Sequence, residues 1–230
     1  MLKSASIYTI LKTPDLITTI PIQRISSKMP APKETSPYKA SLTRRQFLFP
    51  EMRITARLMA SGLSDQEITK QILENNLFQY PTEKSLRDLS AYCIQQLRAI
   101  DAPLIKAVAE GPLEEAKQIC LYAMMKQSRL VYDFMVGVIG EKYRQQDFSF
   151  DRIDINSFFF RLQEQDSVVA TWSETTINKL KQVLVKILVQ TGYLSSTKST
   201  SLNLVFLNSA LKKSIEIQND FAVLPAFNCF

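Results

Sequence analysis

Apolar residues recur at spacings of three and four along most of the chain, which is the pattern of helices with one buried face. Between residues 83 and 100, for example, the repeat consists of Leu86, Leu89, Cys93, Leu97 and Ile100. Runs that alternate apolar and polar residues, as half-buried strands do, are scarce, and the chain has only 5 glycines. The pattern therefore predicts a mainly α-helical protein.

Helix start and stop signals divide residues 38–110 into short helices. Pro50 suits the first turn of a helix that Gly62 would end, and Ser64 with Glu67 forms a capping box for the next. Thr82 would cap a third helix, residues 83 to about 100. This order predicts a helix-turn-helix-like N-terminal domain. However, the linker "ENNLFQYP" is longer than the three to four residues of the plain motif.

The polar face of the predicted third helix is a candidate DNA contact. Lys84, Arg87 and Arg98 would lie opposite the apolar stripe, with Ser85 at the helix start. A helix that enters a DNA groove has such a face, and so does the solvated face of any bundle helix. Ahead of these helices, "TRRQF" adds Arg44 and Arg45 as further candidates.

Residues 111–150 read as a helical connector with helices at about 112–127 and 130–143, in which Met124, Met125 and Met135 fill the core. Asp154 is expected to cap the helix that follows, "INSFFFRLQEQ". Its three consecutive phenylalanines, residues 158–160, must face more than one side. For them we favour burial over stacking on nucleic-acid bases.

Residues 151–230 predict a winged-helix-like C-terminal domain. A short helix precedes a cap at Ser173 and a long helix that Gly192 ends, and "YLSSTKSTSLNLVFLN" reads as a small β-hairpin, the wing. The outward side of the long helix and the tip of the hairpin would carry the DNA contacts. The candidates on the helix are Ser173, Thr175, Thr176, Lys179 and Lys186, and the candidate on the wing is Lys198.

Charge favours a polyanionic partner. The chain has 28 Lys+Arg and 22 Asp+Glu, a net charge of +6 and a sequence pI of about 9.2. Residues 1–50 hold 8 basic and 2 acidic residues, and residues 171–230 hold 6 and 3, so the excess lies at the two ends. Residues 1–37 contain five of the ten prolines and are expected to form a flexible basic arm.

Common catalytic and metal-binding chemistry is missing from the sequence. Histidine is absent, so the usual general base and the commonest transition-metal ligand are not available. The three cysteines are far apart, which indicates reduced thiols and no disulfide framework or zinc site. We therefore expect a cytoplasmic, non-enzymatic protein without metal or cofactor. No apolar run approaches the length of a membrane span.

The motifs "YKASLT", "FLFPE", "GLSDQEI" and "NNLFQYPTEKS", within Tyr38–Leu89, resemble the N-terminal signature of the BrxA family, small accessory proteins of bacterial BREX phage-defence systems. A weaker match covers Thr171–Leu194, and residues 1 to about 36 lie outside the resemblance. "TRRQF" is more basic than the family form, which leaves the roles of Arg44 and Arg45 open.

The resemblance implies a helical, non-enzymatic BREX component that binds DNA, and this implication is strongest for the helix start at Thr82–Arg87. Other BREX proteins are further candidate partners. The N-terminal part is also similar to antitermination factors that bind RNA. The leading hypothesis is duplex DNA binding, mainly through phosphates. The alternatives are an antitermination-like RNA-binding protein or a scaffold that docks other defence proteins.

Overall fold

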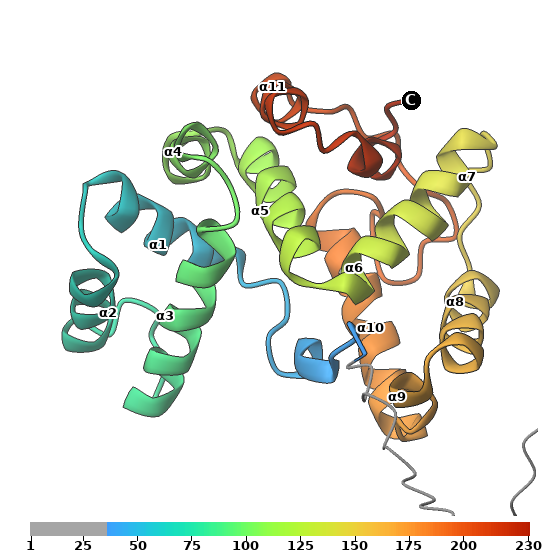
Figure 1. Cartoon of the computed structure of the whole chain (residues 1–230), viewed down its shortest axis with the longest axis horizontal. Coiled ribbons are helices and arrows are strands. Elements are labelled where there is room, and N and C mark those ends of the chain that lie inside the picture. Colours follow the sequence, from blue (N-terminus) through green and yellow to red (C-terminus); the bar gives the residue numbers. More distant parts are fainter. Residues whose placement is uncertain (1–35) are drawn as a thin grey trace, which may run out of the picture. The chain divides into compact units, whose positions relative to one another are not determined.

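The computed structural model describes residues 36–230, whose regular elements are helices (Figure 1). The prediction of a mainly α-helical protein is confirmed. Nearly all of the predicted N-terminal arm lies outside the described residues. Within them, no helix is long and apolar enough to cross a membrane.

Four helices follow one another in the first half of the unit: α1 (Phe49–Ala60), α2 (Asp65–Glu74), α3 (Glu83–Leu97) and α4 (Ala102–Glu110). These helices begin and end near the predicted residues, because the predicted capping and stop residues have these roles in the structure. Gly62 adopts a φ of 85° after α1, a conformation that favours glycine, and Ser64 and Glu67 form the capping box of α2. Helix α1 packs on α3 and α4, and α2 packs mainly on α3.

The middle of the chain forms α5 (Leu113–Gln127) and then one continuous helical run. This run consists of α6 (Arg129–Phe134), the π-helix η2 (Met135–Gly140) and α7 (Glu141–Arg144). Helix α5 contacts α1, α3 and α4 on one side and α6 on the other. Met124, Met125 and Met135 are buried, as predicted.

The second half contains α8 (Arg152–Gln165), α9 (Ser167–Ala170), α10 (Glu174–Gln190), α11 (Ser209–Gln218) and the 3-10 helix η3 (Phe221–Phe227). Ser173 caps α10, and Gly192 follows it with a φ of 84°, both as expected. The cap of α8 is Asp151, and the prediction of Asp154 is wrong. Asp154 instead returns the capping-box hydrogen bond and pairs with Lys142 at 3.0 Å.

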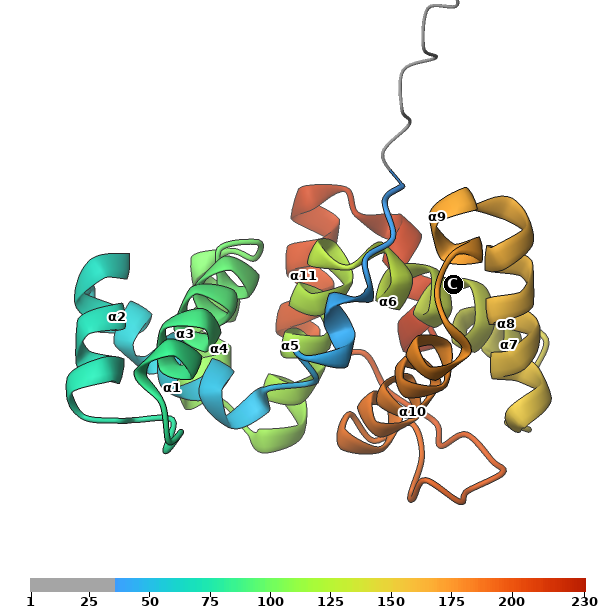
Figure 2. The ribbon, with the colours of Figure 1, turned by 90° about the horizontal axis from the view of Figure 1, so that it is seen from below.

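Each end of the described chain packs on a helix of the opposite half. The 3-10 helix η1 (Ala40–Thr43) packs on α10, where the blue segment of Figure 2 lies. Helix α11 packs on α4, and there the Ser214 hydroxyl donates to Asp101 at 2.5 Å. Each half therefore contributes a segment to the packing of the other.

The predicted β-hairpin is wrong: residues 36–230 contain no β-strand, only an isolated β-bridge between Ser149 and Ser201. The Phe150 N–H donates to the Thr200 carbonyl oxygen at 2.9 Å, and the Leu202 N–H donates to that of Phe148 at 2.7 Å. The segment thus pairs with the chain between α7 and α8, which removes the partner that a hairpin would need.

Candidate nucleic-acid interface

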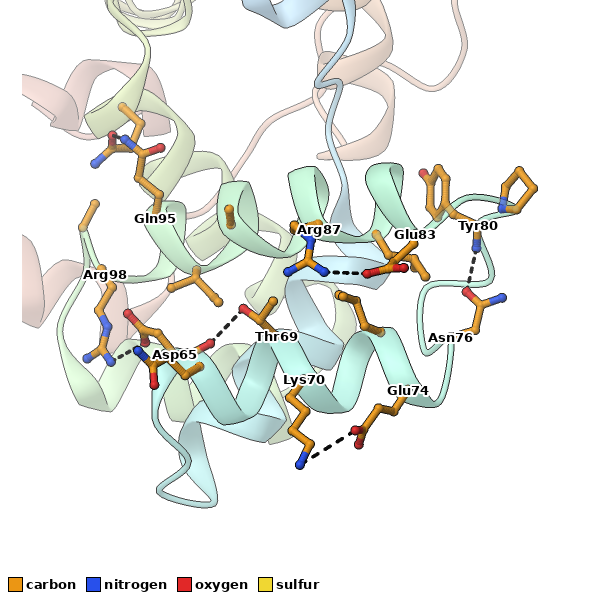
Figure 3. A pocket seen from close by; sticks show the side chains of 18 residues that line it. Asp65, Thr69, Lys70, Glu74, Asn76, Tyr80, Glu83, Arg87, Gln95 and Arg98 are labelled. Carbon is orange, nitrogen blue, oxygen red and sulfur yellow. Dashed lines mark hydrogen bonds and ion pairs between the residues drawn. The ribbon is translucent and has the colours of Figure 1, made fainter.

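The outward face of α3 forms one wall of a groove of about 1300 Å³ between α2 and α3 (Figure 3). Its apolar lining comes from Leu73, Leu86, Ala91 and Ile94. Of the three predicted basic residues, Arg87 and Arg98 line the groove and Lys84 does not.

Every cation in this groove is paired with a carboxylate. Arg87 binds Glu83 at 2.5 Å and Arg98 binds Asp65 at 2.6 Å, while Lys70 and Glu74 approach to 3.8 Å. Three basic side chains thus face three acidic ones, as the dashed lines in Figure 3 show. Each neighbouring carboxylate offsets the charge of its arginine, so the groove attracts polyanions only weakly.

The start of α3 offers one cation without a paired carboxylate among the described residues. Lys84 is exposed there. Ser85 belongs to the helix cap, because its N–H donates to the Thr82 hydroxyl at 3.2 Å and its own hydroxyl accepts from Thr82 at 2.8 Å. The Ser85 hydroxyl only accepts in these contacts, so its own O–H stays available to donate to a phosphate.

Arg44 and Arg45 directly follow η1, the segment that packs on α10. Arg44 is exposed, whereas the Arg45 guanidinium lies 5.1 Å from the centre of the Tyr92 ring. Burial raises the pKa of Tyr92 to about 12, so the ring stays neutral beneath the cation. Of this pair, Arg44 is the one oriented toward solvent.

The exposed face of α10 carries a polar stripe without acidic residues. Thr175, Lys179, Gln182 and Lys186 recur at helical spacing and are all exposed, opposite the buried side of the helix. Thr176 is half-buried, and its N–H donates to the Ser173 hydroxyl at 3.2 Å as part of the cap. Gln182 was not predicted, although the spacing of three and four residues could have identified it.

Lys198 lies in the loop that replaces the expected hairpin. It lines a cavity of about 290 Å³ together with Arg152, at the start of α8. The structure therefore places Lys198 beside α8 and the second half of α10, where Val185 also lines the cavity.

The cations on α8, α10 and the following loop differ from those of the α2–α3 groove in their pairing with carboxylates. On α8, α10 and the following loop, no ion pair with a described carboxylate involves any of six cations, whereas the groove cations are all paired. The six are Arg152, Arg161, Lys179, Lys181, Lys186 and Lys198. The cations of this surface are therefore open to a ligand, as are Arg44 and Lys84 in the first half.

Among residues 36–230, no group of three or more Cys, Asp or Glu side chains is arranged to hold a metal ion. Burial raises the pKa of the Cys93 and Cys120 thiols well above its ordinary value, so these thiols stay protonated inside the core. Both cysteines act as apolar core residues.

Comparison with known proteins gives one consistent result. The family model described as BrxA matches residues 36–219. A BREX protein BrxA from Bacillus cereus (strain H3081.97) is 34% identical over 161 residues, which are 70% of this chain and 80% of that protein. A BREX protein BrxA from Escherichia coli O9:H4 (strain HS) is 27% identical, over 68% of this chain and 74% of its own.

A solved structure has the same fold. The crystal structure of an uncharacterized protein from Magnetospirillum magneticum matches with a TM-score of 0.71 at 23% identity, over 84% of this chain and 98% of that one. Family model, relatives and fold agree over most of the described residues, and the chain belongs to the BrxA family.

Proposed function

We propose that this protein is a non-enzymatic BREX component that binds duplex DNA, mainly through phosphates, with the exposed face of α10 as its main contact. The observation that carries the proposal is the acid-free stripe Thr175, Lys179, Gln182 and Lys186. Helix α10 follows the short helix α9 and a serine cap, which is the order of a recognition helix in winged-helix proteins.

The spacing of the stripe suits a DNA backbone. Lys179 and Lys186 are seven residues apart, which is about 10 Å along a helix, so the two ammonium groups can reach separate phosphates. Thr175 and Gln182 add a hydroxyl and an amide, side chains that bind phosphate oxygens or base edges in complexes with DNA.

The other predicted residues take unequal parts in this proposal. Arg44, Lys84 and Lys198 are exposed cations without a paired carboxylate among the described residues, so they serve as additional phosphate contacts. Glu83 and Asp65 offset the charges of Arg87 and Arg98, which makes the net contribution of these two arginines small.

The test is a double variant on α10. Lys179→Ala with Lys186→Ala should lower affinity for any duplex by roughly 10- to 100-fold at low salt and reduce the salt slope by about two, one for each lost phosphate contact. The matched control, Arg87→Ala with Arg98→Ala, removes the same charge and should lose much less affinity. Equal losses in the two variants, or no loss in either, would sink the role of α10.

Titrations with RNA decide between the nucleic acids. Tighter binding of RNA than of duplex DNA of equal length and at equal salt would favour the antitermination-like alternative.

The α2–α3 groove supports a second candidate function, docking of another BREX protein. Its apolar lining and mutually neutralised charges suit a protein surface better than a polyanion. If the protein binds no nucleic acid at low salt and still co-purifies with other BREX proteins, docking replaces DNA binding as its function.

A further inference from the structure

The three consecutive phenylalanines of α8 do not share one environment. Phe158 and Phe159 are buried, at 5% and 1% exposure, and pack edge to face, as favoured at the sequence level. Phe160, in contrast, is 62% exposed, so the expected burial is wrong for this ring. Core packing explains the first two rings and leaves the third without a structural role.

Phe160 borders a cavity of about 440 Å³ where α8 packs on α10. Two cations, two amides and two aromatic rings form most of the lining, and none of the described residues that line the cavity is acidic. These six are Asn156, Phe159, Phe160, Arg161, Gln163 and Lys181.

The cations of the cavity are not neutralised by carboxylates. The Lys181 ammonium donates to the Asn156 amide oxygen at 2.8 Å and lies 5.8 Å from the centre of the Phe159 ring. Both of these contacts leave its positive charge in place. Arg161 is exposed next to Phe160 and makes no ion pair with a described carboxylate.

We infer that this cavity binds one unpaired nucleotide of a DNA strand, with its base stacked on Phe160 and its phosphate held by Arg161 and Lys181. An exposed ring beside cations is the combination that binds single-stranded nucleic acid, because every base has a face that can stack. The amide N–H groups of Asn156 and Gln163 can donate to a base edge. The inference rests on the proposed function and extends it from paired DNA to an unpaired base.

The test compares three DNA probes of one sequence: a fully paired duplex, the same duplex with one unpaired nucleotide, and the single strand. Wild-type protein should bind the probes with an unpaired base more tightly than the paired duplex. Phe160→Ala should weaken binding of these two probes by roughly 5- to 150-fold, the range of base–aromatic stacking, and leave the paired duplex unaffected. Phe160→Tyr keeps the ring and should retain the preference.

Ile153→Ala is the matched control, because Ile153 is 70% exposed on α8 and does not line the cavity. A wild-type protein without preference for the unpaired base, or equal losses in Phe160→Ala and Ile153→Ala, would overturn the inference while duplex binding through α10 stands. Failure to bind any of the three probes at low salt would overturn the proposed function itself.

Discussion

At the scale of single residues, Tyr38 links the segment ahead of α1 to α6. Its hydroxyl donates to Asp133 at 2.6 Å, and the same carboxylate oxygen accepts from the Arg129 guanidinium at 2.8 Å. Burial, reinforced by the hydrogen bond to Asp133, raises the pKa of Tyr38 to about 12. The folded protein therefore holds this phenol in its neutral form.

The raised pKa predicts a loss of stability in alkali. The contribution of Tyr38 is fully present below about pH 10, the ordinary pKa of tyrosine, and is lost as pH rises to about 12. Tyr38→Phe should lower the free energy of unfolding by about 1 kcal/mol at neutral pH and flatten its decline above about pH 10. Denaturant titrations of both proteins at about pH 8 and pH 11 measure this. Parallel declines would mean that Tyr38 is not a source of the pH dependence.

The ion pairs of the α3 face differ in whether the sequence alone predicts them. The partner of Arg87 is four residues away on the same helix, a spacing that alone predicts a pair. The partner of Arg98 is Asp65, from another helix, and only the packing of α2 on α3 brings the two together. The composition of the α3 face therefore suggested free cations where the fold supplies bound ones.

At the scale of elements, local signals predicted helix ends but not the elements that depend on distant partners. Ser64, Thr82 and Ser173 all cap the helices they were expected to cap, because a cap needs only its own first turn. The π-helix η2 packs on η3. The segment expected to form a hairpin instead pairs with the chain between α7 and α8. Those contacts join residues far apart in the sequence.

Two glycines of η2 provide a test of this dependence. A Cβ on Gly140 would lie 2.8 Å from the Pro225 Cβ and 2.9 Å from the Pro225 carbonyl carbon, whereas one on Gly137 would meet nothing within 4 Å. Gly140→Ala should destabilise the protein by roughly 1–3 kcal/mol, because the backbone of η3 must move. Gly137→Ala should stabilise it by about 0.5–1 kcal/mol through helix propensity.

Thermal and denaturant unfolding of the two variants measure the difference directly. Equal effects of the two substitutions would show that the close packing of η2 on η3 does not constrain this helix.

At the scale of the whole molecule, the sequence predicted the location of the net charge better than it predicted the packing between distant segments. The basic C-terminal region was expected, and α10 does carry cations without paired carboxylates among the described residues. No local sequence pattern predicts that η1 packs on α10 or that α11 packs on α4, because each contact joins segments about a hundred residues apart or more.

The packing of α11 on α4 leads to a prediction about the stability of residues 36–230. Asp101 caps α4 by accepting from the Leu104 N–H at 3.0 Å, and its second carboxylate oxygen accepts from Ser214 of α11 at 2.5 Å. Ser214→Ala removes the second contact and the hydrogen bond that Ser214 accepts from Gln218 at 3.0 Å. It should cost roughly 1–2 kcal/mol, since Ser214 is buried and leaves a charged acceptor less satisfied. Ser209→Ala, at an exposed position of α11, is the matched control and should cost much less.

Because a segment from each half packs on the other half, wild-type protein and the Ser214→Ala variant should both unfold in a single cooperative transition. Circular dichroism and the fluorescence of Trp172 measure this transition. Helices in both halves report to the first signal, while Trp172, between α9 and α10, reports only on the second half. Coincident curves would mean that the crossed ends couple the halves. Separate midpoints would instead support independent domains with boundaries near residues 110 and 150, as the sequence predicts, and would assign the crossing contacts little energy.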